Sequence, residues 1–341
     1  MPKIIDSFLF FQELDLLEVR LRYLDPYVDV FLIVEAAQTF SGKPKDFVFA
    51  RNRDRFAKYL PKIYYHQIHD SHADFASVVD WLGQQPLAAY QHVRALLLGH
   101  GHYPRSELRW VLDTYHRERI HVALADVSAP QDIVLLSDLD EVPDRAVFAT
   151  AMAPGGQPQV CRQHEFRYYL NFYKDSCWLG TIVGRYEVMR GLSLNTLRVD
   201  SKLTRLLIAP EPIFPGGYHF TSCGGLDAIR EKIRSWAHQE FNTSAVLSRL
   251  EENIRTGQDI FGREGGTTMT KLDLTGSLMD SRLAAIIGEY PALLYGGEIQ
   301  QVFPGPWGRL WRKLYGLPGK VRFKLAERWR RLGVRARERQ R

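Results

Sequence analysis

Residues 133–143 read IVLLSDLDEVP, an apolar run that leads directly into three carboxylates within four residues. A short apolar run bounded by polar residues predicts a buried strand over 132–137. Upstream, further apolar runs predict strands over 4–10, 28–34 and 62–68, and helical spacing of apolar residues predicts helices over 13–24 and 106–127. Strands that alternate with helices imply an α/β fold with a mostly parallel central sheet and helices on both of its faces.

The second half of the chain has a different pattern. Residues 159–173 and 178–190 are rich in aromatic and β-branched side chains, which predicts antiparallel strands, and 226–241 and 243–256 predict helices. The aromatic side chains of the first run either form core or offer faces on which sugar rings stack. We expect a mixed, antiparallel C-terminal half beside the parallel sheet.

The composition is typical of a soluble enzyme, with 45% hydrophobic and 25% charged residues in a chain of 341. Three cysteines are too few for a disulfide framework and fit a reducing compartment. No run approaches 18 uncharged apolar residues, and the N-terminus lacks the signal-peptide pattern. These features predict a cytoplasmic location.

The net charge of +6 is unevenly distributed. Residues 309–341 carry 13 Lys and Arg against two Glu, a net charge of +11, which leaves −5 for the rest of the chain. An acidic body argues against a nucleic-acid partner. Over 307–332 the basic residues are interspersed with Leu, Val and Trp. This predicts an amphipathic tail that holds the protein on the inner face of an anionic membrane, the alternative being a solvated tail.

The carboxylates that follow the apolar run indicate a chemical site. Asp138, Asp140 and Glu141 lie so close in sequence that their mutual repulsion favours a neutralising cation. Carboxylate oxygens suit Mg²⁺ or Mn²⁺, and such an ion would also offset charge on a diphosphate leaving group. The alternative is a solvated acidic turn in which Asp144 caps a helix.

A metal-dependent phosphatase is a rival interpretation of the same motif. Asp-x-Asp-x-Val after an apolar strand also opens the phosphatases of the haloacid-dehalogenase type. Those enzymes place the motif on their first strand and require a later Gly-Asp-x-x-x-Asp. Here the motif follows three predicted strands and no such sequence comes after it. We therefore rank the phosphatase below a transferase.

Five segments, in order, resemble glycosyltransferase family 17, the family of the bisecting N-acetylglucosaminyltransferases. They are DSFLFFQELDLLEVRL (6–21), IVEAAQTFSGKPK (33–45), LSDLDEVP (136–143), GYHFTSCGG (217–225) with KIRSWAHQE (232–240), and GQDIFGR (257–263). The resemblance spans roughly residues 4–263. We expect residues 70–118 to be longer than and different from the family's pattern, and we expect no counterpart of the membrane anchor of the animal members.

The resemblance implies a GT-A fold, a UDP-sugar donor such as UDP-N-acetylglucosamine, dependence on Mn²⁺ and inversion at the anomeric carbon. It implies a glycosyltransferase domain over 1–305, with a nucleotide-sugar-binding half (1–150), an acceptor half (151–305) and a basic tail (306–341). We expect a bacterial enzyme that acts on a glycan or lipid-linked glycan during assembly of a surface glycan. A non-catalytic glycan- or membrane-binding protein with the same fold is the opposed interpretation.

Site residues follow from the matched segments and from the ends of the predicted strands. His219 could complete a metal site with Asp138 and Asp140, or be a core histidine. An inverting transfer needs a general base, and the candidates are Glu165, Asp227 (alternatively a helix cap) and Asp259. Predicted donor contacts, each of which could instead be ordinary turn or surface chemistry, are Phe10, Glu13, Glu35, Thr39, Gly42, Lys43, Arg119 and Asp138.

Overall fold

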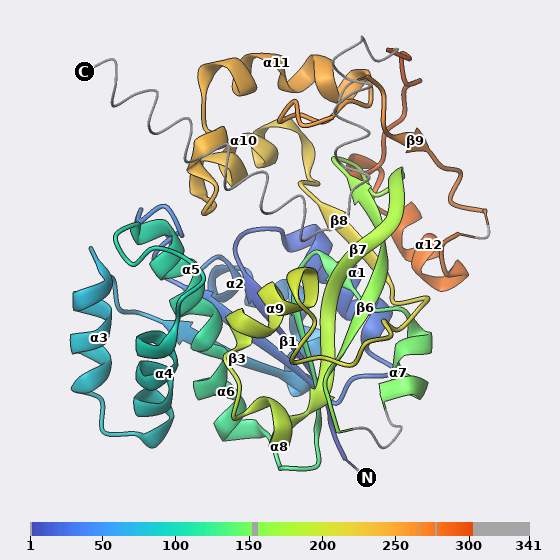
Figure 1. Cartoon of the computed structure of the whole chain (residues 1–341). Helices are drawn as coiled ribbons and strands as arrows, with labels where there is room; N and C mark the ends of the chain where they lie inside the picture. The colour runs from blue at the N-terminus through green and yellow to red at the C-terminus, as the bar shows by residue number, and fades with distance from the viewer. Residues whose placement is uncertain (1, 152–155, 265, 277, 303–341) are drawn as a thin grey trace, which may run out of the picture.

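The computed structural model describes residues 2–151, 156–264, 266–276 and 278–302. These residues fold around one nine-stranded sheet of order β3-β2-β1-β4-β7-β6-β8-β5, with β9 paired to β7. The predicted α/β fold is confirmed, and its architecture is that of a GT-A-like fold (Figure 1). The strands are β1 (Ile4–Phe10), β2 (Val30–Ala36), β3 (Ile63–Ile68), β4 (Ile133–Asp138), β5 (Glu141–Val142), β6 (Gln159–Arg167), β7 (Phe172–Arg185), β8 (Tyr218–Thr221) and β9 (Thr270–Lys271).

Strand direction decides where a ligand can bind. Strands β1 to β4 are parallel to one another. Strand β7 is antiparallel to both β4 and β6, and β8 is parallel to β6. Seven strands, from both halves of the chain, therefore run in the same direction: β1 to β4, β6, β8 and the two-residue β9, which is antiparallel to β7. Their carboxyl ends share one edge of the sheet, the place where ligands bind in α/β proteins.

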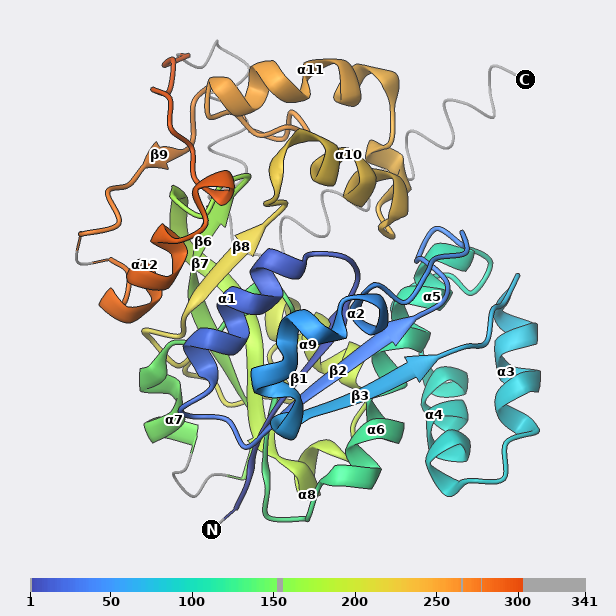
Figure 2. The same ribbon diagram turned by 180° about the vertical axis from the view of Figure 1, so that it is seen from behind.

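Helices cover both faces of the sheet, as the two opposite views show (Figures 1 and 2). Strand β2 is apolar on both sides: Phe31 and Ile33 belong to one core cluster, and Leu32 and Val34 to the other. Alternate side chains of a strand point to opposite faces, so a strand covered on both faces is a continuous apolar run. One face carries α1 (Leu14–Leu24), α2 (Val48–Arg51), α7 (Arg145–Ala151) and α12 (Ser281–Gly288), and the other carries α5 (Leu108–Glu118), α6 (Ile120–Val127), α8 (Tyr186–Met189) and α9 (Leu194–Leu203).

Residues 70–118, which the sequence predicts to differ from the family pattern, contain a helical hairpin. Helices α3 (Phe75–Gly83) and α4 (Ala88–Gly99) pack on each other beside α5 and α6. The side chain of Asp74 begins α3, since it accepts a hydrogen bond from the Ser77 backbone at 2.8 Å. The predicted helix over 106–127 is two helices that meet at Arg119.

The elements of the second half of the chain differ in part from those that the sequence predicts. The predicted strands at 159–173 and 178–190 are β6 and β7, but 168–171 form a turn and 186–189 form α8. Among the described residues, no helix is both long and apolar enough to cross a membrane. The predicted tail over 306–341 lies outside the described residues. The remaining helical segments are η1 (Arg53–Lys62), α10 (Gly225–Ser235), η2 (Gln239–Phe241), α11 (Ser244–Arg255) and η3 (Pro291–Leu293).

Candidate active site

A cavity of about 580 Å³ lies at the shared carboxyl ends of the strands. Its wall includes seven Lys or Arg and five Asp or Glu side chains, so its charge favours an anionic ligand. The strands contribute their last residues, the helices α5, α9 and α10 contribute most of the cations, and the segment 235–241 completes the wall. The residues from the strand ends are Phe10 (β1), Ala36 (β2), Asp138 (β4), Glu165 and Arg167 (β6), and His219 and Thr221 (β8).

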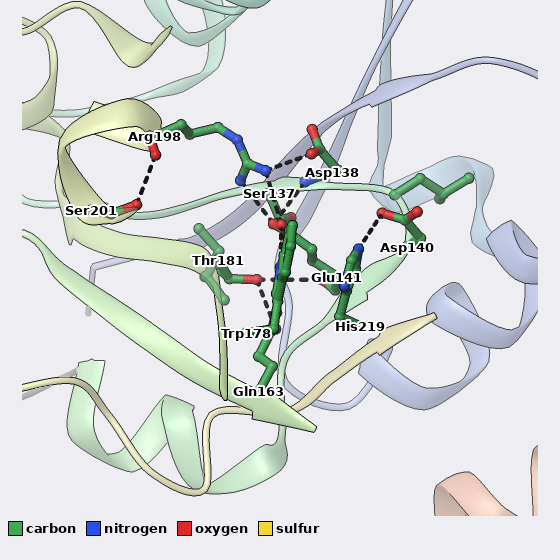
Figure 3. Close-up of polar contacts among 12 residues, drawn as sticks. Ser137, Asp138, Asp140, Glu141, Gln163, Trp178, Thr181, Arg198, Ser201 and His219 are labelled. Atoms are coloured by element: carbon green, nitrogen blue, oxygen red, sulfur yellow. Dashed lines mark hydrogen bonds and ion pairs between the residues drawn. The ribbon is translucent and has the colours of Figure 1, made fainter. Parts of the chain in front are cut away.

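Asp138 is held by two arginines. Nη1 of Arg117 donates to its Oδ1 at 2.8 Å. Nη2 of Arg198 donates to its Oδ2, as Figure 3 shows. Arg198 also donates to both oxygens of the fully buried Glu141, at 2.8 and 2.9 Å. Burial by itself raises the pKa of both carboxyls, but the guanidinium groups outweigh it. The pKa of Glu141 is lowered to about 2, and that of Asp138 lies well below its ordinary value.

Asp140 has different partners and faces the other side of the cavity. Its Oδ2 lies 3.0 Å from Nζ of Lys232 on α10, and its Oδ1 lies 3.7 Å from Nε2 of His219 on β8. The His219 ring stacks on Trp178 with ring centroids 4.0 Å apart. Burial lowers the pKa of His219, more than the nearby carboxylates raise it, so the imidazole is neutral at neutral pH.

The fit of a divalent cation can be judged from these contacts. Both oxygens of Asp138 already accept hydrogen bonds from guanidinium groups, which suits a residue that positions Arg117 and Arg198 better than a metal ligand. Asp140 and His219 present an oxygen and a neutral ring nitrogen to the cavity. The described residues contain no group of three or more metal-ligating side chains. A cation at Asp140 and His219 would therefore complete its shell with water and diphosphate oxygens, as Mg²⁺ commonly does.

Of the three predicted base candidates, only Glu165 lines the cavity. Its Oε1 accepts a hydrogen bond from Nε of Arg167 at 2.7 Å. Burial raises its pKa, but Arg167 and Lys174 lower it to about 2. Asp259 is buried outside the cavity wall in ion pairs with two arginines, and the side chain of Asp227 is 97% exposed. Neither of these two is placed to deprotonate an acceptor in the cavity.

The predicted donor contacts divide in the same way. Phe10, Glu13 and Thr39 line the cavity, whereas Glu35, Gly42 and Lys43 do not. Glu35 is fully buried and accepts hydrogen bonds from the backbone N–H groups of residues 48 and 49 at the start of α2. Gly42 lies in a turn with a φ of +87°, and Lys43 is exposed. The lysine of this loop that reaches the cavity is Lys45, which also pairs with Glu35.

Arg119 is also placed differently from the prediction. It is 2% exposed and pairs with Asp70 at 2.9 Å, beneath the α3–α4 hairpin and away from the cavity wall. Arg117, two residues earlier on α5, is the arginine that reaches Asp138. The helix end that the sequence prediction named does reach the cavity, but through Arg117 and not through Arg119.

Sequence reasoning missed all seven cavity cations: Lys45, Arg117, Arg167, Arg198, Lys202, Lys232 and Arg263. Arg198 and Lys202 are four residues apart on α9, so they lie on the same face of that helix. That spacing was the one available signal for them. Lys232 stood at the start of a segment already singled out, but nothing in its spacing ties it to Asp140.

The comparisons with known proteins agree with this geometry. Residues 1–97 match glycosyltransferase family 17. That segment contains β1, β2 and β3, which form one side of the parallel sheet. It also contains the cavity-lining residues at the ends of β1 and β2 and in the loops that follow them. No curated protein matches the chain. The match supports the family assignment that the sequence predicted, and because it includes residues 70–97 it contradicts the predicted departure from the family pattern over those residues.

Proposed function

With its N-terminal segment assigned to glycosyltransferase family 17, the chain is a glycosyltransferase, and we propose that it transfers N-acetylglucosamine from UDP-N-acetylglucosamine, with inversion, to a glycan or lipid-linked glycan. The observation that carries this proposal is the cavity at the carboxyl ends of β1, β2, β4, β6 and β8, which run in the same direction. Its wall has an excess of cations, as the diphosphate of a nucleotide-sugar requires.

The cations divide between two places. Arg117, Arg198 and Lys202 gather around Asp138, and Lys232 lies beside Asp140. The carboxylates hold the cationic side chains in position before a ligand arrives. Such preorganised charge stabilises the negative charge that develops on a leaving diphosphate, because no reorganisation is needed during the reaction.

We propose that Asp140 and His219 hold Mn²⁺ or Mg²⁺ together with the donor. When bound, such an ion neutralises diphosphate charge and so improves the leaving group. Lys232 supplies a second positive charge at the same place from the protein itself. Its pKa is pulled down by burial and up by Asp140, and the net direction is upward, so it is a cation at neutral pH.

Glu165 is the proposed general base. It is ionised at neutral pH, lines the cavity on the β6 side, and lies in register with His219 of β8. A carboxylate with so low a pKa is a weak base. It gains strength when an incoming acceptor hydroxyl replaces Lys174, whose Nζ lies 3.5 Å from its Oε2.

The test is turnover of a panel of UDP-, GDP- and dTDP-sugars with Mn²⁺, Mg²⁺ or EDTA, read as release of nucleoside diphosphate. We expect slow release from UDP-N-acetylglucosamine that EDTA abolishes. Asp140→Asn should lower the rate by about 100-fold, the effect of losing several kcal/mol of charge stabilisation. Asp227→Asn is the matched control, because this exposed aspartate is outside the cavity wall.

Two results would count against the proposal. If neither EDTA nor Asp140→Asn changes the release of nucleoside diphosphate, the proposed metal site at Asp140 and His219 is wrong. If calorimetry detects no binding of any nucleotide-sugar, with or without metal, the chain is not a nucleotide-sugar-dependent transferase. The non-catalytic binding protein would then be the better interpretation.

A further inference from the structure

His116 has a buried ring nitrogen whose hydrogen bond no other described residue supplies. The residue lies on α5, is 3% exposed and lines the cavity. Its Nε2 is buried and has no hydrogen-bond partner among the described residues. An unsatisfied buried polar atom costs about 1–3 kcal/mol, so such atoms are rare unless a ligand completes them.

The unsatisfied atoms of the described residues are not spread at random. Nine buried side-chain nitrogen or oxygen atoms lack a partner. Four belong to residues of the cavity wall: His116, Arg117, His219 and Trp236. Four residues of the cavity wall therefore carry a buried polar atom without a hydrogen-bond partner among the described residues. Among them, His116 has a ring contact with Phe40, which follows β2.

The neighbours of His116 indicate which part of a ligand it meets. Its ring centroid lies 5.5 Å from that of Phe40, which follows β2. The next residue on α5, Arg117, is directed to Asp138 at the end of β4. Two consecutive residues of α5 thus face different parts of the cavity: His116 faces Phe40, and Arg117 faces Asp138 and the cations around it. A nucleoside joined to a diphosphate at that cluster would extend toward Phe40 and His116.

The charge of the ring agrees with a neutral partner. Burial lowers the pKa of His116 to about 3, so the ring is uncharged at neutral pH. A neutral imidazole has one N–H donor and one acceptor nitrogen, and adds no attraction for phosphate. It suits a ribose hydroxyl or the edge of a nucleobase, each of which can hydrogen-bond to either form of the nitrogen.

We infer that Nε2 of His116 hydrogen-bonds the nucleoside of the donor and so helps to select the nucleotide. This inference rests on the proposed function, because it assumes a nucleoside diphosphate donor. His116 is a binding and specificity residue in this scheme, and takes no part in the transfer itself.

The test compares His116→Phe with His92→Phe by calorimetry against UDP, 2′-deoxy-UDP and inorganic pyrophosphate. His92 is the matched control, because its Nε2 is also buried and without a partner among the described residues, yet it is not part of the cavity wall. We expect His116→Phe to lower the affinity for UDP about 10-fold, the effect of losing one hydrogen bond. Its affinity for pyrophosphate should not change. His92→Phe should bind both like the wild type, and His116→Gln should recover part of the UDP affinity.

The 2′-deoxy-UDP measurements identify the contacted group. If the wild type binds this ligand as weakly as His116→Phe binds UDP, the partner is the 2′-hydroxyl. If the wild type binds the two ligands equally and His116→Phe weakens both, the partner is elsewhere on the nucleoside.

Three results separate the possible failures. If His116→Phe binds UDP as the wild type does, the inference is wrong. The inference is equally wrong if both His116→Phe and His116→Gln bind pyrophosphate and UDP more weakly than the wild type does, because the effect is then not specific to the nucleoside. If the wild type binds neither UDP nor any nucleotide-sugar, the proposed function has failed first, and His116 is not the cause.

Discussion

Replacing Arg198 by Met tests the central ion cluster. Arg198 binds both oxygens of Glu141 and one oxygen of Asp138. Asp138 keeps Arg117 in the variant. Glu141, which is fully buried, would keep only neutral donors, namely the Trp178 indole at 2.9 Å and the Asp138 backbone N–H at 3.1 Å. Removal of one partner of a buried ion pair typically costs about 3–5 kcal/mol.

The loss should depend on pH in a defined direction. In the wild type the pKa of Glu141 is lowered to about 2, so its contribution to stability is present above its ordinary pKa and is lost as the pH falls toward 2. Without Arg198, burial raises the pKa of Glu141 above its ordinary value. The variant is then destabilised most near pH 7, where it must keep a buried charge, and the difference from the wild type shrinks as the pH falls toward 4.

The assay is urea unfolding of both proteins between pH 4 and pH 8. Arg255→Met is the control, because its pair with Glu252 is exposed and should contribute less than about 1 kcal/mol. The double variant Arg198→Met/Glu141→Gln should regain part of the lost stability, since it no longer buries a carboxylate. A loss at pH 7 no larger than that of Arg255→Met would refute the reasoning, as would a loss that does not change with pH.

Three further predictions follow from the same contacts. Arg117→Lys should raise the KM for the donor about 10-fold, whereas Arg119→Lys should lower the melting temperature and leave KM unchanged; equal KM effects would contradict the assignment of Arg117 to the cavity. Glu165→Gln should abolish transfer while UDP still binds, and Asp259→Asn should mainly destabilise the fold; an active Glu165→Gln enzyme would exclude Glu165 as the base. The full chain should bind vesicles with anionic lipid through residues 309–341, with an affinity that falls as salt is raised; equal binding to zwitterionic vesicles would contradict this.

Most of the sheet could be predicted because its strands are buried on both faces. A strand such as β4 is then a continuous apolar run bounded by polar residues, which is visible without any knowledge of its neighbours. The break between α5 and α6 at Arg119 was not visible, because that junction contains neither glycine nor proline. The turn at 168–171 was hidden by aromatic residues, which favour strands but here include Tyr168 with a φ of +70°.

The site was predictable only where function and strand ends coincide. Phe10, Asp138 and His219 lie at or near strand ends, so the direction of the strands brings them to one cavity. Glu35 also lies near a strand end, but its side chain is used to start α2. An acid at the end of a strand can contact a ligand or accept hydrogen bonds from the start of a helix. Which of the two it does depends on the segment that packs beside it, and local sequence spacing does not show that.

The two aspartates of the Asp-Leu-Asp turn have separate partners, and that separation explains how the site works. Asp138 forms ion pairs with arginines of α5 and α9, and Asp140 with a lysine of α10. Ion pairs therefore connect three helices to one turn. The sequence suggested that clustered acids require a metal ion, yet the protein supplies cations of its own for them. The carboxylates therefore act first as anchors that fix Arg117, Arg198 and Lys232 at the cavity wall. Because the wall retains more positive than negative side chains, the diphosphate of the proposed donor would meet charge that is already in place.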